Sequence, residues 1–166
     1  DWLAGNSIES DLYGGYKFKA GGLDMDLGAL AYIYPGNGSG NTAELYGAAS
    51  YGPFTAKYSH TVSKDYFGLA GAKTSGQRGR NTGYLNLAFA RELMPSVTLK
   101  AALGYTRFAG GIRDLGVPHY VDYSLGGAYD FGSGLQLSAA LAGANKKGFF
   151  GDANKARLIA TLTKTL

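Results

Sequence analysis

The stretch ESDLYGGYKFKAGGLDMDLGALAYIYPG, residues 9–36, alternates charged or polar side chains with apolar ones on both sides of a Gly-Gly pair. The even positions before Gly21-Gly22 are mostly apolar or small, and after this pair the odd positions are. An alternation with period 2 is typical of a strand whose two faces meet different surroundings. The stretch therefore predicts a β-hairpin with one apolar and one polar face.

The same period continues along the rest of the chain and predicts nine strands. They are expected at residues 8–20, 23–34, 42–51, 54–62, 84–89, 97–106, 121–131, 135–141 and 157–166. No segment shows a convincing period of 3.6, so we expect no helix. The short links indicate antiparallel pairing. We therefore predict an all-β, up-and-down fold in which residues 1–166 form a single domain.

The composition of the two faces favours a membrane barrel over a soluble β-sandwich. The polar face contains Ser, Thr, Gly, Ala and charged residues, whereas the apolar face is rich in Leu and Ala. Aromatic residues gather toward the ends of the apolar face, as in the aromatic girdles of outer-membrane barrels. They are Phe18, Tyr51, Phe54, Tyr105 and Phe131.

The lengths of the connections between the strands also favour a membrane barrel. The short ones are residues 21–22, 52–53, 94–96 and 132–134, and the long ones are residues 35–41, 64–82, 108–119 and 145–155. Short and long connections alternate without exception. Outer-membrane barrels have short periplasmic turns and long extracellular loops, whereas a soluble sandwich has no reason to sort its loops by length. We expect an integral outer-membrane protein of a Gram-negative bacterium, with the short turns in the periplasm.

The composition excludes several other classes of protein. The 166 residues carry 16 Lys and Arg against 12 Asp and Glu, a net charge of +4, and 17% of residues are charged, below the roughly 25% of soluble domains. The chain has no cysteine, so it cannot form a disulfide framework or a thiolate metal site. The basic residues are interleaved with acidic ones and form no continuous stripe, so nucleic acid is not an expected partner.

The odd number of strands suggests a larger barrel, because bacterial single-chain barrels have an even number of strands. With short turns in the periplasm, the strand at residues 8–20 runs downward, and so does the last one. We therefore expect the chain to be the C-terminal part of a barrel of about 12 strands that lacks its N-terminal strands.

Two stretches give a family resemblance. DLYGGYKFKAGGLDMDLGALAYIYPG and NTAELYGAASYGPFTAKYSHTVSKDYFG resemble the TorF-family porins of proteobacterial outer membranes. The most specific matches are Tyr-Pro-Gly at 34–36, Asn-Thr-x-Glu at 41–44 and Tyr-Gly-Pro at 51–53, and the similarity continues more loosely through YVDYSLGGAYDF and the final strand. The resemblance implies an outer-membrane barrel with a pore, but no established substrate and no catalytic residues.

Charged residues on the predicted polar face are the candidate pore-lining groups. They are Glu9, Asp11, Lys17, Lys19, Asp24, Asp26, Glu44, Lys57, Lys100, Asp122, Asp130 and Arg157. Opposed acids and bases in a lumen would create a transverse field and select solutes. The alternative is a network of cross-strand pairs that fills a narrow barrel. The two lysines and two aspartates beside Gly21-Gly22 favour such pairing locally.

Basic residues in the long loops are candidates for contact with lipopolysaccharide phosphates. They are Lys73, Arg78, Arg80, Lys146 and Lys147. The alternative for these residues is ordinary solvated loop charge. The expected partners are thus outer-membrane lipid, lipopolysaccharide and small hydrophilic solutes, and homo-oligomers or surface-assembly partners stay open.

An enzyme is not expected. His119, Asp122 and Ser124 contain the residue types of a hydrolytic triad, but their spacing does not establish the hydrogen bonds that a triad needs. His60 falls on the apolar face near a rim, where an interfacial side chain is expected rather than a ligand. No metal and no cofactor are predicted. The sequence predicts a passive pore for small hydrophilic solutes, with a non-conducting structural or interaction barrel as the alternative.

Overall fold

The computed structural model describes residues 8–68 and 76–165, and in these residues nine strands form one antiparallel sheet. The strands are β1 (Ser10–Ala20), β2 (Leu23–Ile33), β3 (Thr42–Tyr51), β4 (Phe54–Thr61), β5 (Gly83–Met94), β6 (Val97–Arg107), β7 (Tyr120–Gly132), β8 (Leu135–Ala144) and β9 (Arg157–Lys164). Each strand pairs with the next one in the sequence, so the predicted up-and-down order is confirmed.

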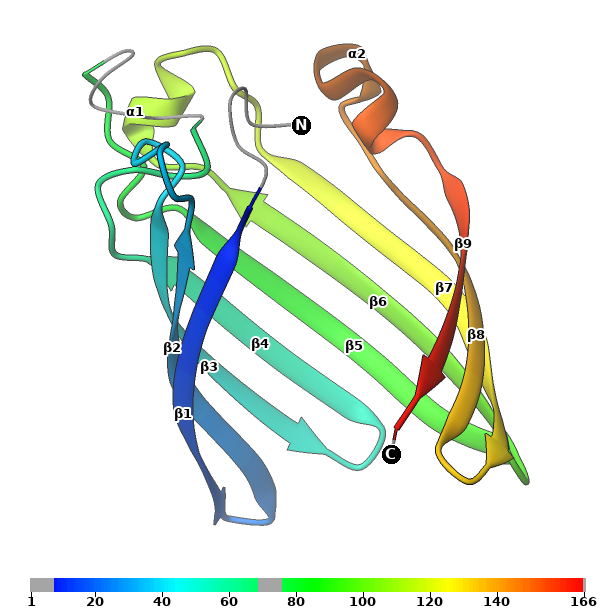
Figure 1. The fold of residues 1–166 in the computed structure, drawn as a ribbon. Helices are drawn as coiled ribbons and strands as arrows, with labels where there is room; N and C mark the ends of the chain where they lie inside the picture. The colour runs from blue at the N-terminus through cyan, green and yellow to red at the C-terminus, as the bar shows by residue number, and fades with distance from the viewer. Residues whose placement is uncertain (1–7, 69–75, 166) are drawn as a thin grey trace.

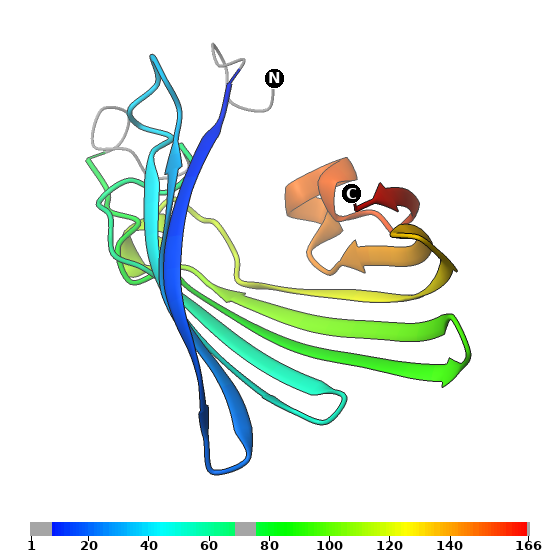
Figure 2. The ribbon, with the colours of Figure 1, turned by 60° about the horizontal axis from the view of Figure 1, so that its bottom comes forward.

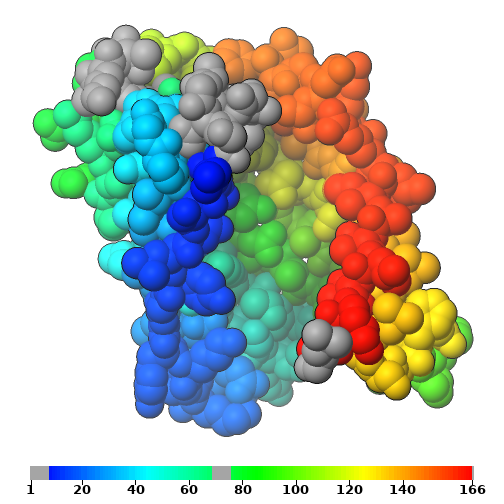
Figure 3. Space-filling view, in the orientation of Figure 1, coloured from blue at the N-terminus to red at the C-terminus, as the bar shows by residue number. Residues whose placement is uncertain are grey.

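The sheet is strongly curved and open along one side (Figures 1 and 2). Its edge strands, β1 and β9, lie on opposite sides of a trough, and the space-filling view shows the hollow between them (Figure 3). All short turns lie at one end of the trough, and the long loops lie at the other (Figure 1). The predicted sorting of connections by length is therefore confirmed.

The boundaries of the strands differ little from the predicted ones. The largest difference is in β5, which continues to Met94, five residues beyond its predicted end, because the alternation is lost near the bulge between Glu92 and Met94. The turn between β1 and β2 consists of Gly21 and Gly22, whose φ angles are 57° and 82°. A two-residue hairpin turn with positive φ at both positions favours glycine.

The expectation that the chain contains no helix was wrong. Two helical turns lie in the long loops, α1 (Gly110–Arg113) and α2 (Lys147–Phe150), and a short 3-10 helix, η1 (Gly151–Asn154), follows α2. Each is four residues long, which is too short to produce a period in the sequence. No helix among the described residues is long and apolar enough to span a membrane.

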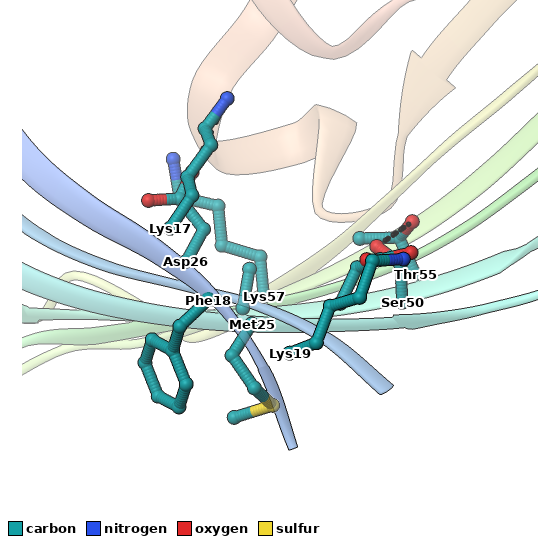
Figure 4. Close-up of a pocket in the computed structure, with 10 residues that line it drawn as sticks. Lys17, Phe18, Lys19, Met25, Asp26, Ser50, Thr55 and Lys57 are labelled. Atoms are coloured by element: carbon teal, nitrogen blue, oxygen red, sulfur yellow. Dashed lines mark hydrogen bonds and ion pairs between the residues drawn. The ribbon is translucent and has the colours of Figure 1, made fainter. Parts of the chain in front are cut away.

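The register gives the sheet one apolar and one polar face. Directly paired residues include Leu87 with Leu103, Leu125 with Leu141 and Leu137 with Leu162, so the apolar sets of neighbouring strands share a face. This apolar face carries the even positions of β1, β4 and β9 and the odd positions of the other strands. It is the outside of the trough, and we call it the convex face. The opposite positions form the polar concave face (Figure 4).

Little of the sheet is buried. The accessible surface of the chain is 10421 Å², whereas a compact soluble protein of this mass exposes roughly 7,800 Å². The buried cluster of large apolar side chains consists of Phe108, Ile112 and Val117, which come from the loop between β6 and β7. The apolar side chains of the sheet therefore have no second layer of described residues to pack against.

Candidate functional site

The polar concave face holds the residues that the sequence nominated as pore-lining. Eleven of the twelve candidates lie in strands at concave-face positions, and Glu9 comes directly before β1. The eleven are Asp11, Lys17, Lys19, Asp24, Asp26, Glu44, Lys57, Lys100, Asp122, Asp130 and Arg157. The register thus brings charges from seven strands onto one side of the sheet.

Charges beside the Gly21-Gly22 turn form pairs across β1 and β2. Lys19 Nζ lies 2.7 Å from Asp24 Oδ1, and Lys17 Nζ lies 4.0 Å from Asp26 Oδ2. Both lysines are largely exposed, so each pair contributes little to stability, about 0–1 kcal/mol. The pairing that the sequence suggested is confirmed (Figure 4).

A tyrosine extends this group toward β4. The Tyr46 hydroxyl donates to Asp26 Oδ1 at 3.3 Å, and Lys57 Nζ lies 4.3 Å from the centre of the Tyr46 ring. The ring lies over β2 at Gly28, where an added Cβ would come within 2.6 Å of the Tyr46 Cζ atom. Only glycine leaves room for the ring at this position.

A second tyrosine, Tyr84 of β5, lies over the neighbouring strand β6. The Tyr84 hydroxyl donates to Asp122 Oδ1 at 3.0 Å and accepts a hydrogen bond from Asn86 Nδ2 at 3.3 Å. A Cβ at Gly104 would overlap the Tyr84 hydroxyl. Neither tyrosine was predicted as a site residue, although each occupies a concave-face position and has a glycine close by in a neighbouring strand. A tyrosine at a concave-face position, with a glycine in the neighbouring strand, is therefore the sequence pattern that could have identified both residues.

The charges of the concave face are sorted along the strands, which was not predicted from the sequence. At the long-loop end, four acidic residues face two basic ones: Glu9, Asp11, Glu44 and Asp122 against Lys155 and Arg157. Toward the short turns the face is balanced: Lys17, Lys19, Lys57 and Lys100 against Asp24, Asp26, Glu92 and Asp130. The long-loop end of the trough is therefore the acidic end.

Aromatic side chains connect the two sides of the trough at the long-loop end. Neighbouring ring centres lie 4.8 Å apart for Tyr32 and Phe67, 4.9 Å for Phe67 and Tyr66, 6.0 Å for Tyr66 and Phe108, 6.0 Å for Phe108 and Tyr120, and 5.4 Å for Tyr120 and Phe150. We call these six residues the ring cluster. It runs from β2 through two long loops to β7 and α2.

The ring cluster borders a cavity of about 510 Å³. Glu9, Tyr34 and Asn154 also line it, and the Tyr34 hydroxyl donates a hydrogen bond to Glu9 Oε2. Burial raises the pKa of Tyr34, and the hydrogen bond to Glu9 adds to this effect. Burial also raises the pKa of Tyr66. Both hydroxyls therefore stay protonated at neutral pH.

The four candidates for lipopolysaccharide contact that lie in the described residues are at the long-loop end, in two separate loops. Lys146 and Lys147 are exposed at the start of α2. Arg78 and Arg80 lie before β5, and Arg80 Nε donates to the Val62 carbonyl at 2.8 Å. Lys73 lies outside the described residues.

The residues of a hydrolytic triad are not brought together. His119 Nδ1 accepts a hydrogen bond from the Phe108 amide at 2.9 Å, and Asp122 accepts one from Tyr84. Among residues 8–68 and 76–165, no hydrogen bond joins His119, Asp122 and Ser124 to one another. Within the same ranges, no group of three or more His, Cys, Asp or Glu residues is arranged to hold a metal ion. His60 lies on the convex face and contacts Tyr58 and Asn81.

The fold and the concave face together define an all-β protein built as an open, up-and-down antiparallel sheet with a polar inner and an apolar outer surface. Residues 2–165 match the family model described as "Bacterial protein of unknown function (Gcw_chp)", so the chain belongs to the Gcw_chp family. No curated protein and no solved structure matches it. The family description names no activity, and the resemblance to TorF-family porins stays a prediction.

Proposed function

We propose that the chain forms the wall of an outer-membrane β-barrel through which small hydrophilic solutes diffuse passively. The observation that carries this proposal is the inverted distribution of side chains. The convex face is mostly apolar along all nine strands, whereas most charged residues of the sheet gather on the concave face. A sheet in water buries its apolar face against a second layer, and a barrel in lipid turns it outward.

The exposure of the convex face is the physical reason for a lipid environment. Leu12, Leu125 and Leu158 are 69%, 59% and 77% exposed. Removal of a leucine side chain from water is worth about 1.5–3 kcal/mol, so contact of a contiguous face of this kind with water is strongly unfavourable. The strands contain 8–13 residues, which covers the roughly 9–11 residues that a tilted strand needs to cross a bilayer.

Aromatic residues at both ends of the convex face support the same conclusion. Tyr51 and Phe54 are exposed near the short turns, whereas Tyr58 and Tyr105 are exposed toward the long loops. Aromatic side chains at these two levels correspond to the girdles that lie in the lipid headgroup regions. The apolar band between them consists mainly of leucine and alanine residues.

Closure of the barrel requires further strands between β9 and β1. Both edge strands run from the long-loop end to the short-turn end, so an antiparallel closure needs an odd number of additional strands. Three would give the barrel of about 12 strands that the sequence suggested, which is wider than the side-chain-filled interior of an eight-stranded barrel.

The sorting of charges along the concave face leads to a preference among solutes. Under this proposal the long loops are extracellular, so the acidic end of the trough is the outer entrance. Carboxylates near the entrance attract cations and repel anions. We therefore expect a weakly cation-selective pore.

Recording in planar lipid bilayers tests this function. The purified full-length protein should produce discrete conductance steps, and under a salt gradient the reversal potential should have the sign of a cation preference. Glu44→Gln and Asp122→Asn together should reduce this preference, whereas Asp130→Asn at the other end should change it less. Absence of conductance from a folded, heat-modifiable protein would contradict the proposal.

A non-conducting barrel is the second candidate, and the ring cluster favours it. The six rings cross the trough from β2 to α2 and narrow its long-loop end. If they seal the barrel, the wild-type protein is silent in bilayers. Phe108→Ala combined with Phe150→Ala then opens a conductance, which separates a closed pore from a purely structural barrel.

Labelling of single cysteines tests the location and the orientation. The chain has no cysteine, so Lys147→Cys in α2 and Ser133→Cys in a short turn each introduce a unique thiol. A membrane-impermeant maleimide added to intact cells should label the first variant and not the second. Equal labelling of the two variants would contradict the outer-membrane location with extracellular long loops.

A further inference from the structure

The cavity beside the ring cluster has a composition that points to one class of ligand. Tyr32, Tyr66, Phe108, Tyr120 and Phe150 border it with their rings, and the carboxylate of Glu9 is its charged group among the described lining residues. Neither lysine nor arginine lines this part of the cavity. The site therefore combines electron-rich ring faces with one negative charge.

Two polar groups that line the cavity are engaged within the protein. The Tyr34 hydroxyl donates to Glu9, and Asn154 Nδ2 donates to the Asn145 carbonyl. The hydroxyls of Tyr32, Tyr66 and Tyr120 are the other side-chain donors of the described lining. A hard metal ion prefers several oxygen ligands, and Glu9 supplies the only carboxylate of the described lining.

Further acidic residues strengthen the negative potential near the cavity. Asp11 is paired directly opposite Tyr32, and Glu44 lies in the adjacent strand. Two basic residues, Lys155 and Arg157, line a neighbouring cavity of about 420 Å³ that also includes Asp122. Both contact Asp152, since Lys155 Nζ lies 2.6 Å from Asp152 Oδ1 and Arg157 donates to the Asp152 carbonyl at 2.7 Å.

We propose that this cavity binds a small organic cation through its ammonium group. Ring faces attract a cation through their quadrupole, and quaternary ammonium groups are commonly held by several aromatic rings. Glu9 adds a direct charge interaction, which water partly screens because the residue is exposed. The site is on the solute side of the sheet, but binding does not depend on whether the barrel conducts.

Calorimetric titration of the purified full-length protein in detergent micelles tests the site. The probes are choline and its uncharged isostere dimethylbutanol, which share a shape and differ in charge. Choline should bind at least about tenfold more tightly than the isostere. Equal affinities would mean an apolar cavity without cation recognition and would overturn the proposal, as would no choline binding up to about 100 mM.

Two substitutions in the cavity and one control outside it test whether choline binds at this site. Glu9→Gln should weaken choline binding about fivefold to tenfold, and Tyr66→Leu about threefold to tenfold, while isostere binding changes less. Asp114→Asn removes an exposed carboxylate at the same end of the molecule, outside the cavity, and should leave both affinities unchanged. Wild-type choline affinity in Glu9→Gln would overturn the proposal. If the Glu9→Gln variant does not fold, the proposal is decided by the affinities of choline and dimethylbutanol for the wild type and for Tyr66→Leu.

Discussion

The two faces of the β1–β2 hairpin have the same backbone geometry and opposite chemistry. On the concave face Lys19 pairs with Asp24. One residue earlier, on the convex face, Phe18 lies opposite Met25 (Figure 4). The charged pair points into the trough, and the apolar pair points away from it. This is the reverse of a soluble sheet, whose curved interior is its hydrophobic core.

The difference between the faces shows where this protein obtains its stability. The convex face packs against no second layer of the described chain, and the buried apolar cluster is confined to Phe108, Ile112 and Val117 in one loop. Backbone hydrogen bonds along eight strand pairings are thus the main internal interaction. Under the proposed function, a bilayer around the convex face would supply the rest without a second layer of protein.

A charge on the convex face should have the largest effect. Leu87→Arg, near the middle of β5, is expected to destabilise the folded protein in phospholipid vesicles by about 2–4 kcal/mol, because the guanidinium would lie in hydrocarbon. Urea-induced unfolding measures the change. Asn86→Arg is the matched control, since the neighbouring residue lies on the concave face. Equal stabilities of the two variants would mean that the convex face does not contact lipid.

A methyl group on the concave face should have a smaller effect. Gly28→Ala places a Cβ 2.6 Å from both the Tyr46 ring and the Gly14 carbonyl oxygen, and such overpacking costs about 1–3 kcal/mol. Gly14→Ala is the control, because a Cβ there meets nothing within 4 Å on the convex face. It should leave the free energy of unfolding unchanged or raise it slightly. The prediction fails if the two alanine variants are equally stable.

The paired charges near the short turn should contribute less still. A double-mutant cycle with Lys19→Gln and Asp24→Asn should give a coupling free energy below about 1 kcal/mol that decreases with added salt. The cycle for Phe18→Ala and Met25→Ala, on the convex face of the same strands, should not depend on salt. A salt-independent coupling of the charged pair would show that it is shielded from solvent.

The smallest change in stability is expected on acidification, from protonation of His119 in the loop between β6 and β7. Partial burial lowers the pKa of His119, and Arg113 and Arg107 lower it further. The neutral ring accepts the hydrogen bond of the Phe108 amide, so this interaction is fully present above about pH 6.5 and is lost as the pH falls through the lowered pKa. The ring is only partly buried, so the change in stability is well below about 1 kcal/mol.

The loss of the hydrogen bond between the Phe108 amide and His119 is measured as the hydrogen-exchange protection of this amide at different pH values. Protection should fall below about pH 6.5 in the wild type, and His119→Asn should remove the pH dependence. His60→Asn is the control, because His60 lies on the convex face and contacts Tyr58 and Asn81 instead. The same pH dependence in His119→Asn would assign the effect to another group.

Much of the fold was predictable because strand periodicity is local. The alternation through residues 9–36 identified β1, its turn and β2, and it placed Lys17 and Asp26 on the same face before any register was known. The strand ends were predicted less well, as in β5, where the bulge near Glu92 interrupts the alternation. The helical turns α1 and α2 were missed, because four residues hold no periodic pattern.

The sequence by itself thus determined the nine strands, their two faces and the alternation of short and long connections, since each depends on neighbouring residues. The tertiary structure alone decided which distant side chains meet. The contact of Tyr84 with Asp122 spans 38 residues, and the ring cluster joins β2 to α2. Such contacts depend on the stagger and curvature of the sheet, which accumulate over several strands and which no local pattern records.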